Sequence, residues 1–97
     1  MQTDKTIILP DGRTLGYAEY GDSLGFPLFY FHGGQESRLS SMFMDSSAKT
    51  LNIRIISPDR PGIGISTFQE NRQFLDWGND IAQLADSLGL DKYSVFG

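Results

Sequence analysis

The sequence predicts an α/β fold in which an antiparallel hairpin precedes parallel strands with crossover helices, in an incomplete sheet. Three observations carry this prediction. An Asp-Gly pair at residues 11–12 separates two strand-like runs. Apolar runs then alternate with segments whose apolar residues recur every three to four positions, which is typical of parallel strands with right-handed crossovers. The last run, residues 93–96, has no helix after it to cover one of its faces.

The predicted hairpin pairs residues 5–9 with residues 13–20. Gly12 in the turn between them accepts the positive φ that a tight hairpin turn requires. In the second run, one set of residues alternates with another: Leu15, Tyr17 and Glu19 with Gly16, Ala18 and Tyr20. This period of two predicts an antiparallel strand near an edge of the sheet.

Residues 28–31 form a continuous apolar run, which predicts a strand covered on both faces. A helix is expected after it, with one side formed by Leu39, Met42, Phe43, Ser46 and Leu51. Met42, Phe43 and Met44 belong either to the core or to the lining of a substrate pocket, and the pattern leaves both open.

Residues 53–56 predict the next strand, and the turn-forming residues 57–62 end it. A second amphipathic helix is expected to begin at Phe74 and to end before Gly89, a glycine of the helix C-terminal type. Its apolar side comprises Phe74, Trp77, Ile81, Leu84, Ala85 and Leu88. A final strand follows at residues 93–96.

Composition excludes several classes of function. The net charge is −4 and no Lys or Arg cluster is present, which argues against a nucleic-acid partner. The chain has no cysteine, so disulfides and Cys-ligated metals are excluded. Asp76 and Asp80 lie four residues apart on the second helix, and a solvent-exposed face explains them better than a metal site. We expect no metal and no cofactor.

No apolar run is long enough to span a bilayer, and residues 1–5 are polar without the pattern of a secretory signal. We therefore expect a soluble, cytoplasmic protein that contacts no membrane. The oligomeric state is not indicated by the sequence.

Four segments in this order resemble the α/β-hydrolase superfamily, particularly the esterases, peptidases and epoxide hydrolases that share a His-Gly loop. The segments are DGR at 11–13 before YAEYG at 17–21, FHGGQESRL at 31–39, PDRPGIGIS at 58–66, and the helix at 80–88 before GLDKY at 89–93. The resemblance implies a serine hydrolase of the α/β-hydrolase fold.

The same resemblance implies that residues 1–97 are the N-terminal segment of a single α/β-hydrolase domain. Gly97 matches the first glycine of the nucleophile elbow G-x-S-x-G. The catalytic Ser, acid and His would all follow Gly97, so we expect this chain to be inactive alone. A small-molecule substrate is expected only if the C-terminal part completes the domain.

The resemblance also implies a site at His32, Gly33 and Gly34. Gly34 matches the residue whose backbone N–H donates to the oxyanion, and the absence of a Cβ lets the intermediate approach closely. His32 and Gly33 support this loop. Gln35 stands where many relatives carry Pro, which makes the loop less rigid or aims it differently. The alternative is an ordinary glycine-rich turn.

His32 is the only histidine and could be considered as a general base. No elbow serine accompanies it in this chain, and the resemblance implies that it shapes the loop by hydrogen-bonding the backbone. We therefore predict a supporting role without proton transfer.

Two further motifs are predicted to be structural. GDSLG at 21–25 matches G-x-S-x-G literally, but a strand follows it instead of the helix that an elbow requires, so a turn between strands is expected. DRPGIG at 59–64 lacks the Lys of a phosphate loop. Asp59 is expected to accept backbone hydrogen bonds there.

The leading hypothesis is thus the N-terminal part of a Ser-His-Asp hydrolase acting on ester or related bonds. One alternative is a truncated, non-catalytic relative that acts as a binding partner. Another is a non-hydrolytic member of the same fold, because one fold hosts several chemistries.

Overall fold

The computed structural model describes residues 1–73 and 75–97. Its elements are the strands β1 (Gln2–Ile8), β2 (Thr14–Gly21) and β3 (Phe26–Tyr30), the 3₁₀-helix η1 (Arg38–Met44), α1 (Asp45–Thr50), β4 (Ile53–Pro58), α2 (Asp76–Ser87) and β5 (Ser94–Phe96). The strands form one mixed sheet in the order β1-β2-β4-β3-β5. β2 pairs antiparallel with both β1 and β4, whereas β3 pairs parallel with β4 and β5. The predicted hairpin followed by parallel strands is confirmed.

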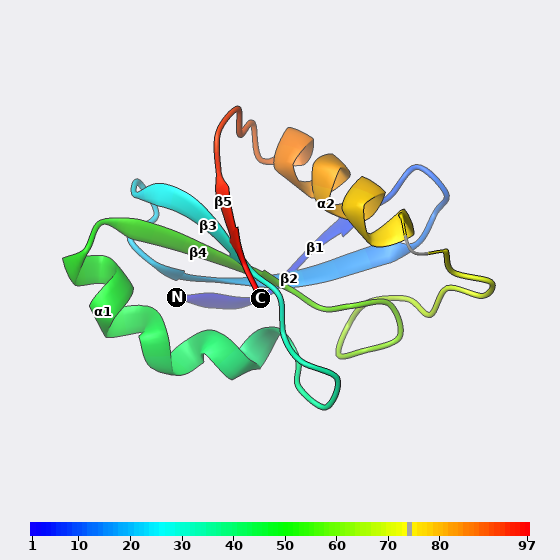
Figure 1. Cartoon of the computed structure of the whole chain (residues 1–97), viewed down its shortest axis with the longest axis horizontal. Coiled ribbons are helices and arrows are strands. Elements are labelled where there is room, and N and C mark those ends of the chain that lie inside the picture. Colours follow the sequence, from blue (N-terminus) through cyan, green and yellow to red (C-terminus); the bar gives the residue numbers. More distant parts are fainter. Residues whose placement is uncertain (74) are drawn as a thin grey trace.

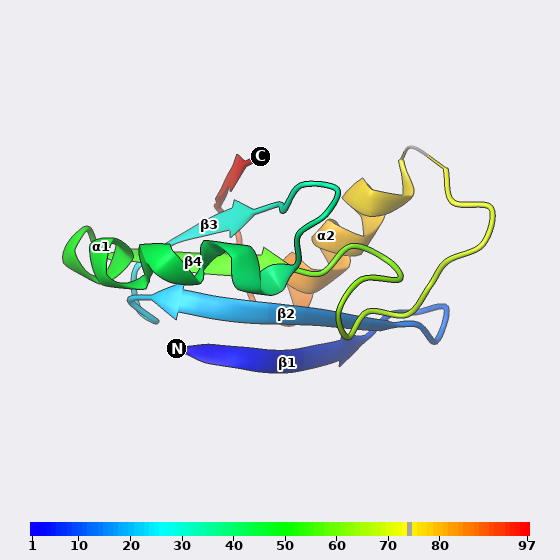
Figure 2. The same ribbon diagram turned by 90° about the horizontal axis from the view of Figure 1, so that it is seen from below.

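Helices cover both faces of the sheet. Figure 1 shows α2 on one side and α1 on the other, and Figure 2 shows β1 along one edge. The larger core cluster, on the α2 side, comprises Leu9, Leu15, Tyr17, Phe29, Ile56, Ile81, Leu84 and Ala85. The smaller one, on the α1 side, comprises Ala18, Tyr20, Ala48 and Ile55. β2 therefore alternates as predicted, but both of its faces are buried.

The two glycines that were predicted to form a hairpin turn and a helix end do so in the structure. Gly12 has a φ of +91°, and Leu9 N–H donates to Arg13 O at 2.8 Å to close the hairpin. Gly89 has a φ of +70° and ends α2 in a Schellman motif, in which Leu90 N–H donates to Ala85 O at 2.9 Å. The predicted first residue of this helix, Phe74, lies outside the described residues, and α2 begins at Asp76.

The predicted apolar face of the first helix is wrong. Residues 38–44 form a 3₁₀-helix, and its buried side chains are Arg38 and Ser41. Phe43 is 79% exposed and Leu51, after α1, is 65% exposed. The cause is a polar anchor, because Tyr20 Oη donates to Arg38 O at 2.9 Å and fixes which side of the helix faces the sheet. Met44 alone of the three residues left open packs against the smaller core cluster.

The last strand leaves one side of the sheet open, as predicted. β5 pairs with β3, and all three of its residues are exposed. Its apolar residues Val95 and Phe96 are 54% and 60% exposed. Among the described residues, no helix has the length and apolar character needed to cross a membrane.

Candidate functional site

Three segments meet at one edge of the sheet, beyond the carboxyl ends of β3, β4 and β5. Because these strands run parallel, the residues after each of them lie on the same side. Phe31 N–H donates to Phe96 O at 2.9 Å, and a Cβ on Gly97 would lie 2.5 Å from Phe31 O. Gly97 thus lies directly beside the segment that leads to His32, as the two views of the chain end also show (Figures 1 and 2).

His32 is 1% exposed, and both of its ring nitrogens contact the backbone. Arg60 N–H donates to Nε2 at 3.0 Å, and Nδ1 lies 2.7 Å from Gly33 O. A backbone N–H can only donate, so Nε2 is the acceptor and the proton sits on Nδ1, which donates to the carbonyl. The predicted backbone hydrogen bonding is present, and no ring nitrogen remains for a reacting group.

Gly33 and Gly34 form a turn that Glu36 closes. Glu36 N–H donates to Gly33 O at 3.2 Å, and the Glu36 carboxylate accepts from Gly33 N–H at 2.9 Å. Gly34 N–H has no hydrogen-bond partner in residues 1–73 and 75–97. A Cβ on Gly34 would have no heavy atom within 4 Å. The turn therefore presents one unused donor with open space around it.

Asp59 anchors the loop after β4 to the start of η1. It is fully buried, and its carboxylate accepts from Arg38 N–H at 2.7 Å and from Ile65 N–H at 3.0 Å. The predicted backbone hydrogen bonds are therefore present. The sequence-based reasoning missed the ion pair with Arg38, whose Nη1 lies 3.0 Å from Asp59 Oδ2. A charged residue at the start of an otherwise apolar helical segment was the available signal.

Arg38 extends this anchor to the N-terminal strand. Its Nη2 donates to Asp4 at 2.8 Å, and its Nε donates to the Thr3 carbonyl. Burial acts to lower the pKa of Arg38, but the contacts with Asp4 and Asp59 outweigh it and raise the pKa. The guanidinium is thus charged and ties three segments together next to the His32 turn.

The segment from Gly21 to Gly25 is a turn between β2 and β3, as predicted. Gly25 N–H donates to Asp22 O, and Leu24 N–H donates to the Asp22 carboxylate, both at 2.9 Å. A strand follows directly, so Ser23 does not lie on a strand-to-helix elbow.

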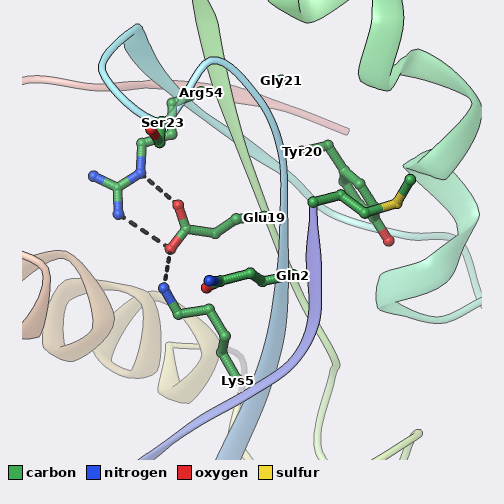
Figure 3. A pocket seen from close by; sticks show the side chains of 8 residues that line it. Gln2, Lys5, Glu19, Tyr20, Gly21, Ser23 and Arg54 are labelled. Carbon is green, nitrogen blue, oxygen red and sulfur yellow. Dashed lines mark hydrogen bonds and ion pairs between the residues drawn. The ribbon is translucent and has the colours of Figure 1, made fainter.

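A cavity of about 350 Å³ lies near this turn, at the end of β2 and β4 opposite to His32. Figure 3 shows Glu19 in it between Arg54 and Lys5. Arg54 Nε lies 2.6 Å and Lys5 Nζ 2.7 Å from the Glu19 carboxylate. This carboxylate is satisfied by two cations and has no reacting partner among the described residues, so the cluster is structural.

The prediction of a solvent-exposed face for Asp76 and Asp80 is wrong for Asp80. Asp80 is 5% exposed and receives two hydrogen bonds from Arg13, at 2.7 and 3.1 Å. The hairpin turn brings Arg13 against α2, which a helical repeat cannot indicate. Asp76 accepts from Gln73 N–H at 2.8 Å, just before the helix.

Comparisons with known proteins find similarity in structure only. No protein-family model and no curated protein sequence matches the chain. An esterase from Exiguobacterium antarcticum matches 100% of this chain with a TM-score of 0.83 and 21% identity. An epoxide hydrolase from Vigna radiata matches 95% (TM-score 0.81, 24% identity), and a bromoperoxidase from Bacillus anthracis matches 98% (TM-score 0.82, 24% identity).

The chain spans only 35%, 29% and 34% of the lengths of these three proteins, respectively. All of the similar structures have the α/β-hydrolase fold. The chain therefore has the α/β-hydrolase fold and corresponds to the N-terminal portion of its sheet.

Proposed function

Starting from this N-terminal portion of an α/β-hydrolase fold, we propose that the chain is part of a Ser-His-Asp hydrolase and supplies half of its oxyanion hole. The observation that carries the proposal is the unused N–H of Gly34, presented at the same sheet edge as Gly97. Oxyanion holes are built from such donors, held in place before the negative charge develops.

In this mechanism Gly34 N–H donates to the oxygen of the tetrahedral intermediate. The second donor is the N–H of the residue that follows the nucleophile. The surroundings of Gly34 suit this role, because His32 and Glu36 fix the turn on both sides through the contacts described above. A donor that is already held costs no reorganisation during the reaction.

In this proposal the nucleophile, its His base and the orienting acid come from a longer chain beyond Gly97 or from a second polypeptide. The serine attacks the carbonyl carbon while His accepts its proton, and the acid holds the His tautomer. The substrate is a small molecule with an ester or related bond, which binds once the remainder of the domain is present.

Two substitutions of Gly34 test this proposal in the natural-length protein. Gly34→Pro removes the N–H, and we expect kcat for p-nitrophenyl acetate to fall about a hundred- to thousandfold. Gly34→Ala keeps the N–H, and its Cβ meets no atom of the chain within 4 Å, so the turn is preserved and kcat falls much less than in Gly34→Pro. Circular dichroism checks that both variants are folded. Equal kcat values for folded Gly34→Pro and Gly34→Ala would contradict the proposal.

The intact mass of the natural protein separates this proposal from the non-catalytic alternative. A species well above 10.8 kDa that contains these peptides and hydrolyses esters supports the hydrolase. A species at 10.8 kDa without such activity supports a truncated relative that binds a partner.

A further inference from the structure

A second cavity adjoins the sheet edge that carries Gly34. It measures about 460 Å³, within the range of small-molecule sites. Its lining residues are Arg60, Arg72, Gln73, Leu75, Trp77 and Gly78, and we refer to it as the arginine pocket. The connection between β4 and α2 contributes the residues up to Leu75, and the first turn of α2 contributes Trp77 and Gly78.

Arg60 is held in this pocket by groups that leave its charge unpaired. Its Nε donates to His32 O at 3.0 Å, which connects the pocket to the Gly34 turn. Its guanidinium carbon lies 5.2 Å from the ring centre of Trp77 and 5.9 Å from that of Phe31. These two aromatic rings orient the planar guanidinium of Arg60 but leave its terminal NH₂ groups available for a ligand.

Two positive charges therefore face one cavity. Neither Arg60 nor Arg72 forms an ion pair with any residue in the described part of the chain. The other lining residues are uncharged. Burial and the charge of Arg72 lower the pKa of Arg60, as expected for a cation that lacks a counter-ion.

The first turn of α2 forms one wall of the cavity. Leu75, Trp77 and Gly78 belong to the helix N-terminus, where the carboxylate of Asp76 balances the positive backbone dipole. The Trp77 ring and the Leu75 side chain supply apolar surface beside the charges. A ligand that fits has an anionic head group and an apolar body.

We infer that the arginine pocket binds the carboxylate or phosphate group of a small organic anion, through Arg60 and Arg72. Guanidinium groups match both head groups with paired hydrogen bonds. If the chain is part of a hydrolase as proposed, the pocket makes an ester that carries an acid group the preferred substrate, and this part of the inference rests on the proposed function. As a statement about binding, the inference does not depend on turnover.

The test is isothermal titration calorimetry on the protein at its natural length with three probes. Phenylacetate and phenyl phosphate carry the two head groups, and phenylacetamide is the neutral counterpart of phenylacetate. The variant Arg72→Gln removes one charge at an exposed position that forms no ion pair among the described residues. Lys92→Gln removes one charge from an exposed residue outside the pocket and serves as the matched control.

We expect an anionic probe to bind at least about tenfold more tightly than phenylacetamide, and Arg72→Gln to weaken that binding about tenfold. Lys92→Gln leaves the dissociation constant unchanged, and added NaCl weakens binding. Whichever anion binds more tightly identifies the head group. Equal affinities for acid and amide, no binding of any probe, or equal effects of Arg72→Gln and Lys92→Gln would overturn the inference.

The measurement is independent of catalysis. Gly34→Pro lowers kcat under the proposed function but leaves phenylacetate binding intact. Ester hydrolysis without anion selectivity would therefore refute the arginine pocket alone, whereas anion binding that depends on Arg72 would survive a failure of the oxyanion proposal.

Discussion

Replacing Asp59 with Asn tests how the loops at the carboxyl edge of the sheet are held. The buried carboxylate accepts three hydrogen bonds, one through Oδ1 from Arg38 N–H and two through Oδ2, from Arg38 Nη1 and Ile65 N–H. Asn keeps an acceptor for the first of them. In place of Oδ2 it presents an NH₂ group, which cannot accept from either remaining donor.

The expected cost follows from these contacts. Hydrogen bonds to a charged group contribute about 1.5–3 kcal/mol each, and two of them are lost. Arg38 also loses its buried counter-charge, although Asp4 remains. Removing one partner of a buried ion pair typically costs about 3–5 kcal/mol. We expect Asp59→Asn to lower the free energy of unfolding by about this amount, a large part of the roughly 5–15 kcal/mol of a typical domain.

Urea unfolding followed by circular dichroism measures this loss. Asp91→Asn is the matched control, because Asp91 is exposed and forms no ion pair within the described ranges, so its effect stays within about 0.5 kcal/mol. A loss below about 1 kcal/mol for Asp59→Asn, with an unchanged slope m, would refute the anchoring role.

Three other predictions follow from the packing. Gly25→Ala places a Cβ against the backbone carbonyl of Asn52, which cannot move aside, so we expect a loss of about 1–3 kcal/mol in thermal unfolding; an unchanged Tm contradicts this. Burial raises the pKa of Glu19, but hydrogen bonds from its two basic neighbours outweigh it and lower the pKa below the ordinary 4.5. The Glu19 carboxylate therefore stabilises the fold fully above pH 4.5, and this contribution is lost as the pH falls through the lowered pKa. We expect the difference in free energy of unfolding between wild type and Glu19→Gln to narrow from pH 6 to pH 3, and a constant difference would contradict this. Asp80→Leu leaves Arg13 with the exposed Asp11 as its remaining partner, so we expect it to cost about 1–3 kcal/mol, and Arg13→Met with Asp80→Leu recovers most of that loss. A double-mutant cycle with no coupling contradicts the pair.

Much of the fold could be predicted because its signals are local. The turn at Gly12 and the end of α2 at Gly89 follow from the positive φ that each position requires. The parallel pairing of β3 with β4 follows from two short apolar runs separated by a helical segment. In each case the residues that decide the structure are neighbours in the chain.

The errors concern contacts between distant residues. Arg13 and Asp80 are 67 positions apart, and Arg38 and Asp59 are 21 apart. A helical repeat shows which residues share a side of a helix but not which side is turned toward the sheet. The side chain of Phe43 faces solvent for this reason, since the polar anchor and not the apolar residues fixes the rotation of η1.

The candidate site was predictable only in part. The His32 turn could be found because its residues are consecutive and match a known pattern. The arginine pocket could not, because Arg60 and Arg72 lie far apart in the long irregular connection between β4 and α2, and nothing in their spacing indicates a shared cavity.

The strand order also determines when each strand can find its neighbours during synthesis. β3 pairs with β4 and β5, and both are made after it. Tyr30 ends β3 and Pro58 ends β4, so 28 further residues must be added before the first neighbour is complete. At about 5–20 residues per second this takes roughly 1–6 s. During that interval β3 has no partner strand, and its apolar residues remain accessible to other molecules near the ribosome.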